Sequence, residues 1–296
     1  MVGSCSGFTA RPARRGRSRH PRIGAARRLG LRLIALERPG IGASTPHCYA
    51  NIAAWADDVA EIADRLGIGR FACVGLSGGG PYVLACAARC RTRVVGGAIL
   101  GGVAPAVGAE AIGGGLVGVT RRFAPLLEQL RGLGGRALHP TVRLALPLRS
   151  LLFDAYIAIS PEGDRRVFRV PEMRAMFLDD IVRGTRRYAA APLLDLVLFH
   201  RDWGFLVSEV TVPIRLWHGD ADNIVPLAHA EHLASLLPHV ELRIRPGESH
   251  LAGMAAADEI FDALLQLWDD SVSRDAPTRT RFHELSSRAA FTPRRP

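Results

Sequence analysis

A single serine stands between glycines in residues 71–88, FACVGLSGGGPYVLACAA. An apolar run of strand length precedes the serine. An alanine-rich run with Pro81 in its first turn follows it, so the stretch predicts a strand, a tight turn and a helix. Side chains at Gly75 and Gly79 would collide with the closely packed strand and helix, and the G-x-S-x-G spacing holds the Ser77 hydroxyl clear of the sheet. The helix N-terminus favours developing negative charge beside this hydroxyl. The pattern therefore favours a nucleophilic serine over a structural glycine turn.

Strand and helix patterns alternate on both sides of this stretch. Apolar runs predict strands, and apolar residues three and four apart predict helices between them. This alternation is typical of an α/β fold with a mostly parallel central sheet flanked by helices. Residues 101–205 differ, because glycine-rich turns alternate there with helical patterns and no strand pattern appears. We therefore expect a core formed by residues 29–100 and 206–270, with residues 101–205 inserted as a helical cap.

The positive charge of the chain lies at its two ends. Residues 1–32 contain nine arginines and no acidic residue, and residues 274–296 contain six arginines and two acids. The remaining body is slightly acidic, so the net charge of +10 does not indicate a nucleic-acid-binding face. We expect residues 1–28 to form an atypical, disordered N-terminal segment and residues 271–296 a disordered basic tail.

Cysteine usage and hydropathy predict the environment of the chain. Five cysteines without the spacing of a small disulfide scaffold indicate free thiols in a reducing compartment, so we expect a cytoplasmic protein. No apolar run reaches about 18 residues, which argues against a membrane span.

Two loops after later strands carry the groups that would activate a serine. The strand pattern at residues 214–217 runs into a loop with Asp220 and Asp222, and the pattern at residues 240–245 runs into a loop with His250. The carboxyl ends of parallel strands meet at one edge of a sheet, where Ser77 is also expected. A serine hydroxyl needs a base that is oriented by a third group, and these loops offer both.

In residues 30–270, four motifs in order resemble an α/β-hydrolase-fold serine hydrolase of the capped, esterase-like kind. They are ERPGIGAS at residues 37–44, GLSGG at 75–79, GDADNIVP at 219–226 and PGESH at 246–250. The order serine, acid, histidine along the chain is that of the family. The second acid of the third motif fits the family's pattern, which favours Asp222 over Asp220.

The resemblance implies a cofactor-free and metal-free hydrolase acting on a small carboxylic ester or a related small-molecule acyl compound. Ser77, His250 and Asp222 are the implied catalytic residues, acting through an acyl-enzyme, and the Gly78 N–H is an implied oxyanion donor. Hydrolysis of a carbon–carbon bond, or perhydrolysis, on the same triad is an alternative. Epoxide hydrolases and dehalogenases are disfavoured, because those relatives have an aspartate where this chain has Ser77.

Aromatic residues of the expected cap predict an apolar substrate pocket. Phe153, Tyr156 and Phe177 are the candidates, and packing of the cap against itself explains them equally well.

The strand that the family places before residues 31–36 is missing from the sequence. In relatives it lies in the middle of the sheet, between the strands at 31–36 and 71–76, and ends in a His-Gly turn that supplies the second oxyanion N–H. Residues 1–10 are short and polar for a central strand, and they contain no His-Gly. Three interpretations follow: a truncated or frame-shifted N-terminus, a rearranged active enzyme, or an impaired relative with an incomplete oxyanion hole. We favour the first, which predicts poor folding of the chain as written.

Overall fold

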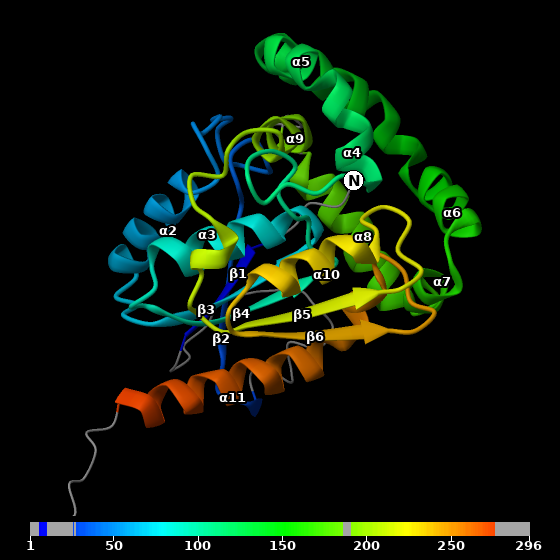
Figure 1. Cartoon of the computed structure of the whole chain (residues 1–296). Helices are drawn as coiled ribbons and strands as arrows, with labels where there is room; N and C mark the ends of the chain where they lie inside the picture. Colours follow the sequence, from blue (N-terminus) through cyan, green and yellow to red (C-terminus); the bar gives the residue numbers. More distant parts are fainter. Residues whose placement is uncertain (1–5, 11–25, 27, 186–190, 276–296) are drawn as a thin grey trace, which may run out of the picture.

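The structure, a computed structural model, describes residues 6–10, 26, 28–185 and 191–275. A six-stranded sheet in the order β2-β1-β3-β4-β5-β6 forms its centre (Figure 1). The strands are β1 (Ser6–Ala10), β2 (Arg32–Leu36), β3 (Phe71–Leu76), β4 (Val94–Leu100), β5 (Ile214–Gly219) and β6 (Val240–Arg245). Strands β3 to β6 pair in parallel. The expected α/β fold with a mostly parallel sheet is confirmed.

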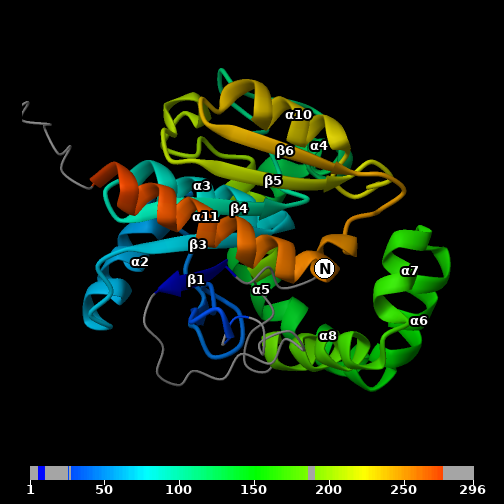
Figure 2. The same ribbon diagram turned by 90° about the horizontal axis from the view of Figure 1, so that it is seen from below.

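Helices cover both faces of this sheet. Helices α2 (Ala54–Arg65), α3 (Gly80–Arg89) and α10 (Leu227–Leu236) lie on one face, and α11 (Ala257–Asp275) crosses the other (Figures 1 and 2). The largest apolar cluster lies between the sheet and helices α2, α3 and α10, and a smaller one lies between the sheet and α11. Two glycines of β4 allow this close approach, since a Cβ at Gly96 would contact Leu267 of α11 and one at Gly97 would contact Val83 of α3.

The central strand that the sequence lacked is supplied by residues 6–10, and it runs in the opposite direction. β1 pairs antiparallel with both neighbours, so that Phe8 lies opposite Ile34 on one side and Cys73 on the other. The expectation that residues 1–10 cannot form a central strand is wrong for residues 6–10. An antiparallel strand satisfies the backbone groups of β2 and β3 as fully as a parallel one. Since this pairing uses backbone groups, a short polar segment can fill the gap.

The chain between β4 and β5 contains helices and no strand within its described residues. The helices are α4 (Gly115–Thr120), α5 (Ala124–Ala145), α6 (Arg149–Ile159), α7 (Glu162–Phe168), α8 (Pro171–Gly184) and α9 (Ala191–Phe199). In Figure 2, α6 and α7 lie beyond the ends of β5 and β6, at the edge where parallel strands place their functional loops. We call this segment the helical insertion.

The C-terminal helix extends further than the sequence indicated. The basic tail was expected from residue 271, but α11 continues to Asp275. Ser271 is buried and its hydroxyl donates to the carbonyl of Trp268, one turn earlier. Residues 276–296, and all of residues 1–28 except 6–10, 26 and 28, lie outside the described part of the chain. No helix that the structure describes is both long and apolar enough to cross a bilayer.

Candidate active site

Ser77 lies at the turn between β3 and α3 in a strained backbone conformation. Its φ of 55° makes it the one non-glycine residue with a positive φ in the described chain. Such strain persists where the surroundings enforce it, and here the close packing of the turn does so. A Cβ at Gly75 would lie 2.5 Å from the carbonyl oxygen of Gly79, so no larger residue fits before the serine. The local geometry therefore matches a nucleophile elbow.

Asp222 and His250 meet in a buried hydrogen bond. The Oδ2 atom of Asp222 lies 2.7 Å from Nδ1 of His250, and both residues are 6% exposed. The other carboxylate oxygen accepts the backbone N–H groups of Ile224 and Val225, each at 2.9 Å. These bonds fix the position of the carboxylate. The carboxylate in turn binds Nδ1 of the imidazole, which leaves Nε2 as the nitrogen that can accept a proton from a nucleophile.

The strand register brings Ser77 to the same edge as this pair. Leu76, just before the serine, pairs with Leu100, and Leu100 pairs with Trp217. Gly101 follows with a φ of 54°, and a Cβ there would lie 3.3 Å from Nδ1 of His250. The Ser77 hydroxyl makes no hydrogen bond to a described residue, His250 included. The structure thus joins Asp222 to His250 directly and places Ser77 at the same edge of the sheet, after β3.

Backbone contacts hold the acid loop and the histidine loop together. Ala221 N–H donates to the carbonyl of Glu248 at 3.0 Å, and Gly247 N–H donates to Oδ1 of Asp220 at 2.7 Å. Asp220 is exposed; its side chain accepts this Gly247 N–H, and its own backbone N–H donates to the carbonyl of Arg245 at 3.3 Å. The two acids of the loop therefore have different tasks, since Asp222 contacts the imidazole and Asp220 links the loops.

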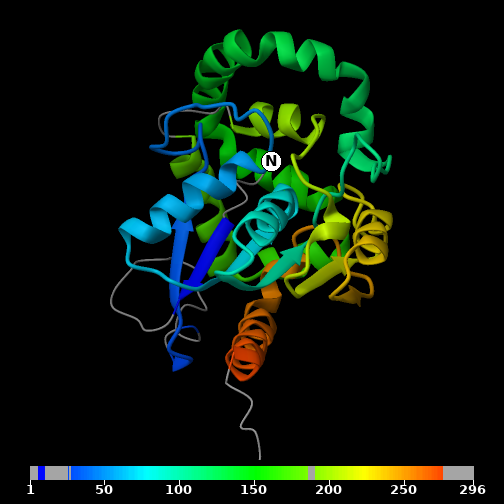
Figure 3. The ribbon, with the colours of Figure 1, turned by 60° about the vertical axis from the view of Figure 1, so that its left-hand side comes forward.

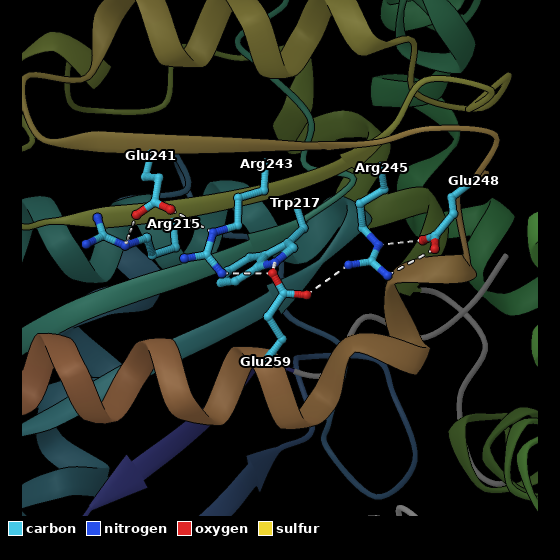
Figure 4. Close-up of polar contacts among 7 residues, drawn as sticks. All are labelled: Arg215, Trp217, Glu241, Arg243, Arg245, Glu248 and Glu259. Carbon is cyan, nitrogen blue, oxygen red and sulfur yellow. Dashed lines mark hydrogen bonds and ion pairs between the residues drawn. The ribbon is translucent and has the colours of Figure 1, made fainter.

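A network of charged side chains anchors the histidine loop to the core (Figure 4). Arg245 binds Glu248 through two hydrogen bonds, of 2.6 and 3.0 Å, and also contacts Glu259 of α11 at 2.8 Å. Glu259 additionally accepts from Arg243 and from the indole N–H of Trp217, both at 2.8 Å. Partial burial opposes ionisation of Glu259, but the Trp217 hydrogen bond and the two arginines lower its pKa overall. The loop that carries His250 is thereby fixed to β5, β6 and α11.

A buried carboxylate of the helical insertion holds the same loop from the opposite side. Asp164 of α7 is 1% exposed, and its two oxygens accept the N–H of Leu251 at 2.8 Å and the hydroxyl of Ser249 at 3.1 Å. These partners flank His250 in the sequence. Burial raises the pKa of Asp164, although both hydrogen bonds oppose that shift. Sequence reasoning missed this residue because the segment EGDRR is typical of an exposed helix start.

A second histidine lies beside the Asp222–His250 pair. His218 at the end of β5 is 1% exposed, and its Nε2 lies 2.7 Å from the carbonyl oxygen of Val225 and 3.4 Å from Oδ2 of Asp222. Because a carbonyl only accepts, Nε2 carries the proton. Burial lowers the pKa of His218, which favours its neutral form.

Comparisons with known proteins identify the family of the chain. Residues 23–252 match the family model described as serine aminopeptidase, S33. The chain belongs to this α/β-hydrolase family. No curated protein matches the hydrolase in sequence.

Several solved structures share its fold. The enol-lactonase from Burkholderia xenovorans has a TM-score of 0.60 at 21% identity, covering 90% of this chain and 98% of its own. A thermophilic esterase from Thermogutta terrifontis has a TM-score of 0.53 at 21% identity, covering 91% and 93%. An α/β hydrolase fold protein from Nakamurella multipartita has a TM-score of 0.57 at 21% identity, covering 90% and 98%.

The aromatic residues expected in the substrate pocket of this hydrolase pack together beside the site. Phe153 and Phe177 are buried with their ring centroids 4.9 Å apart, in a cluster that includes Leu251 next to His250. Tyr156 at its border is half-buried, and burial followed by the charge of Asp164 raises its pKa. Only Tyr156 of the three keeps substantial exposure, and the two phenylalanines stabilise the insertion.

Helix α9 places a further aromatic residue over the elbow of the hydrolase. A Cβ at Gly78 would lie 2.7 Å from Cζ of Phe199, so this ring packs directly against the residue after the serine. Asp195 fixes the helix, because it accepts the Tyr82 hydroxyl of α3 at 2.7 Å and pairs with buried Arg38. Burial and the charge of Asp195 raise the pKa of Tyr82 well above its usual value, so this phenol stays a donor. Phe199 had no recognisable signal in the sequence, where it ends an apolar helical run.

Among the described residues, no group of three or more histidine, cysteine, aspartate or glutamate side chains is arranged so that it could hold a metal ion. A cavity of about 10 Å³ lies beside His250, which leaves room for about one water. A larger cavity of about 370 Å³ lies at the far end of α3, lined by Arg89, Arg91, Phe205 and Glu209 among others. That cavity is remote from the candidate active site and has no part in its chemistry.

Proposed function

We propose that the chain is a serine hydrolase that cleaves a small carboxylic ester or a related acyl compound through an acyl-enzyme. The observation that carries the proposal is the buried 2.7 Å hydrogen bond between Asp222 and His250 at the edge of the sheet where strained Ser77 emerges. Nucleophile, base and orienting acid are the minimum set for acyl transfer by a hydroxyl. Esterase and lactonase activities among structures of the same fold are compatible with this chemistry.

In the proposed mechanism, Ser77 Oγ attacks the carbonyl carbon while His250 Nε2 takes the hydroxyl proton. The Gly78 N–H, in the turn just before α3, donates to the oxyanion of the tetrahedral intermediate. His250 then gives the proton to the leaving oxygen as the ester bond breaks. Water activated by the same imidazole hydrolyses the acyl-enzyme and restores Ser77. Asp222 stays ionised throughout and stabilises the imidazolium.

The missing contact between Ser77 and His250 is compatible with this mechanism. Hydrogen bonds between a nucleophile and its base are often longer before the reacting complex forms. Both residues lie at the same edge of the sheet, and Gly101 at the end of β4, the strand next to that of Ser77, approaches the His250 ring.

A second candidate, a catalytically impaired hydrolase, is favoured by the direction of β1. Its antiparallel course puts its carboxyl end, Ala10, at the edge opposite Ser77, so β1 does not end beside the serine as the oxyanion strand of relatives does. Loss of one oxyanion donor costs roughly 10²–10³ in turnover in other hydrolases.

The experiment is labelling of the full chain with a fluorophosphonate probe, together with turnover of a short p-nitrophenyl ester. Ser77→Ala and His250→Ala should each abolish both, while Ser208→Ala and His239→Ala at exposed positions serve as matched controls. If Ser77→Ala or His250→Ala keeps more than a tenth of the turnover of the unaltered chain, that residue is not part of the mechanism. Labelling without turnover would favour the impaired enzyme. Turnover of a diketone, or hydrogen-peroxide-dependent oxidation, in place of ester cleavage would favour a carbon–carbon hydrolase or a perhydrolase.

A further inference from the structure

Exposed apolar side chains concentrate on one part of the helical insertion. Of fourteen large hydrophobic residues exposed in the described chain, eight lie in residues 115–159. This segment, from α4 to α6, is called the outer arm. It arches along the top of the molecule in Figure 3. Single exposed hydrophobic residues are ordinary, whereas a concentration of them marks a contact surface.

Helix α6 of the outer arm has apolar residues on an inner, buried side and on an outer, exposed side. Its inner face packs Phe153, Tyr156 and Ile157 into the aromatic cluster of the insertion. Its outer side carries Leu152 and Ile159, which are seven residues apart and 53% and 83% exposed, and Leu148 just before the helix is 54% exposed. A helix at the surface of a protein normally turns its apolar residues toward the core and its polar residues outward. The outer face of α6 therefore has an apolar surface that no described residue covers.

The charge of the outer arm is positive and unneutralised. Arg121, Arg122, Arg143 and Arg149 are exposed, and none forms an ion pair with a described residue. The two acidic residues of the segment are already bound by arginines from outside it. Glu128 pairs with Arg201 at 2.6 Å, and Asp154 pairs with Arg174 at 2.8 Å.

We propose that the outer arm is a docking surface for an anionic lipid membrane. Leucine and isoleucine side chains would enter the headgroup boundary, and the arginines beside them would contact lipid phosphates, as interfacial helices do. A second copy of the chain fits this surface poorly, because two such arms would face each other with unneutralised arginines. The inference does not depend on the catalytic assignment, since the arm contains none of the proposed catalytic residues.

The first test is co-sedimentation of the full chain with vesicles of phosphatidylcholine containing a quarter phosphatidylglycerol, and with vesicles of phosphatidylcholine alone. We expect binding to the anionic vesicles that is at least tenfold stronger. Leu148→Asp combined with Leu151→Asp should weaken that binding at least tenfold. Leu206→Asp combined with Val272→Asp, at exposed apolar positions outside the arm, is the matched control and should change it less than twofold. Equal binding by the arm variant and the control would overturn the proposal, because the basic ends of the chain would then explain all of the binding.

The second test separates charge from apolar contact and does not depend on the folding of the aspartate variants. Arg143→Gln combined with Arg149→Gln should weaken binding to anionic vesicles at least threefold. Hydrogen exchange of the unaltered chain should slow within residues 115–159 when anionic vesicles are added. Unchanged exchange there overturns the proposal, as does a dimer that dissociates in the Leu148→Asp, Leu151→Asp protein while vesicle binding persists. Hydrolysis of a water-soluble ester should be the same in all arm variants.

Discussion

The two sides of the candidate active site are built in different ways. On the β5–β6 side, two loops after parallel strands bring Oδ2 of Asp222 within 2.7 Å of Nδ1 of His250. Backbone bonds between the loops, the arginine–glutamate network and Asp164 all support this pair. On the β1–β2 side, the five-residue strand β1 lies between β2 and β3 and runs antiparallel to both. The β5–β6 side has the architecture that the third and fourth motifs imply, whereas β1 completes the sheet without ending at the edge where Ser77 lies.

The contrast shows that sheet continuity and site construction are separate requirements. Any strand of suitable length can pair the backbone groups of β2 and β3, whichever way it runs. A functional loop, in contrast, requires the strand to end at the edge where Ser77 lies. At that edge, β1 presents its first residues, with Ser6 opposite Leu36 of β2.

The largest expected effect is on the β5–β6 side. Asp222→Asn should reduce turnover of a short ester by about 10³–10⁴, because the amide can hold the wrong tautomer of His250 and cannot stabilise its cation. Asp220→Asn should change turnover by no more than about twofold, since its amide oxygen still accepts the Gly247 N–H. Steady-state kinetics of both proteins test this, and the opposite ranking would make Asp220 the catalytic acid.

The next largest effect tests the β1–β2 side. Gly7 lies opposite Ala35 and Val74, so proline there removes a ladder N–H from the centre of the sheet. Gly7→Pro should destabilise the chain by roughly 2–3 kcal/mol, whereas Gly7→Ala keeps the N–H and is the matched control. Thermal melting should drop by roughly 5–10 °C in the proline variant relative to the alanine variant. Identical melting curves would show that residues 6–10 are not part of the sheet.

The same contrast explains what the sequence could predict. The loops with Asp222 and His250 follow apolar strand patterns directly, so their place at the sheet edge follows from local sequence and the parallel rule. The apolar run VVGGAIL coincides with β4, because a fully buried strand is a continuous apolar run. The position of β1 depends on pairing with two strands far along the chain. The polar sequence SGFTA has no local signal for such pairing.

Contacts between the insertion and the core were equally invisible. Asp164 stands in a charged segment that is typical of a solvated helix start, and only the packing of α7 on residues 247–249 reveals its burial. Gly163 permits this packing, because a Cβ there would lie 2.7 Å from the Cα of Glu248. The aromatic residues of the insertion were identified, but which of them faces solvent depends on tertiary packing that periodicity does not determine.

A smaller effect sharpens the account of the β5–β6 side. Asp164→Ala removes both hydrogen bonds that flank His250 and should reduce kcat about 10- to 100-fold by displacing the imidazole, with little change in KM. Asp164→Asn should keep most of the activity, because its oxygen accepts the Leu251 N–H while its N–H donates to the Ser249 hydroxyl. Glu162→Ala, at an exposed position of the same helix, is the control.

The outcome of these variants separates position from charge. Burial raises the pKa of Asp164, so its ionised form costs stability at neutral pH, and that cost lessens as the pH falls through the raised pKa. The asparagine variant should therefore melt no lower than the unaltered chain at pH 7. If Asp164→Ala and Asp164→Asn lose kcat equally, and the acid limb of the kcat–pH profile shifts in both, the effect comes from the charge of Asp164 near His250. Full activity of the alanine variant would show that α7 does not position the loop.

The smallest expected effect concerns His218, which is buried beside Asp222 and His250. Burial lowers the pKa of His218 below its usual 6.5, so the folded chain binds its proton less readily than the unfolded chain does. Stability should therefore fall as the pH drops below about 6.5. His218→Gln keeps a donor for the Val225 carbonyl and cannot be protonated, and the difference between the two proteins cancels the contributions of the other histidines. Between pH 7 and pH 5, the unaltered chain should lose about 2–4 °C more in melting temperature than the glutamine variant. Parallel pH dependence would show that His218 is protonated without cost, and the Asp222 carboxylate 3.4 Å away would then be stabilising its cation.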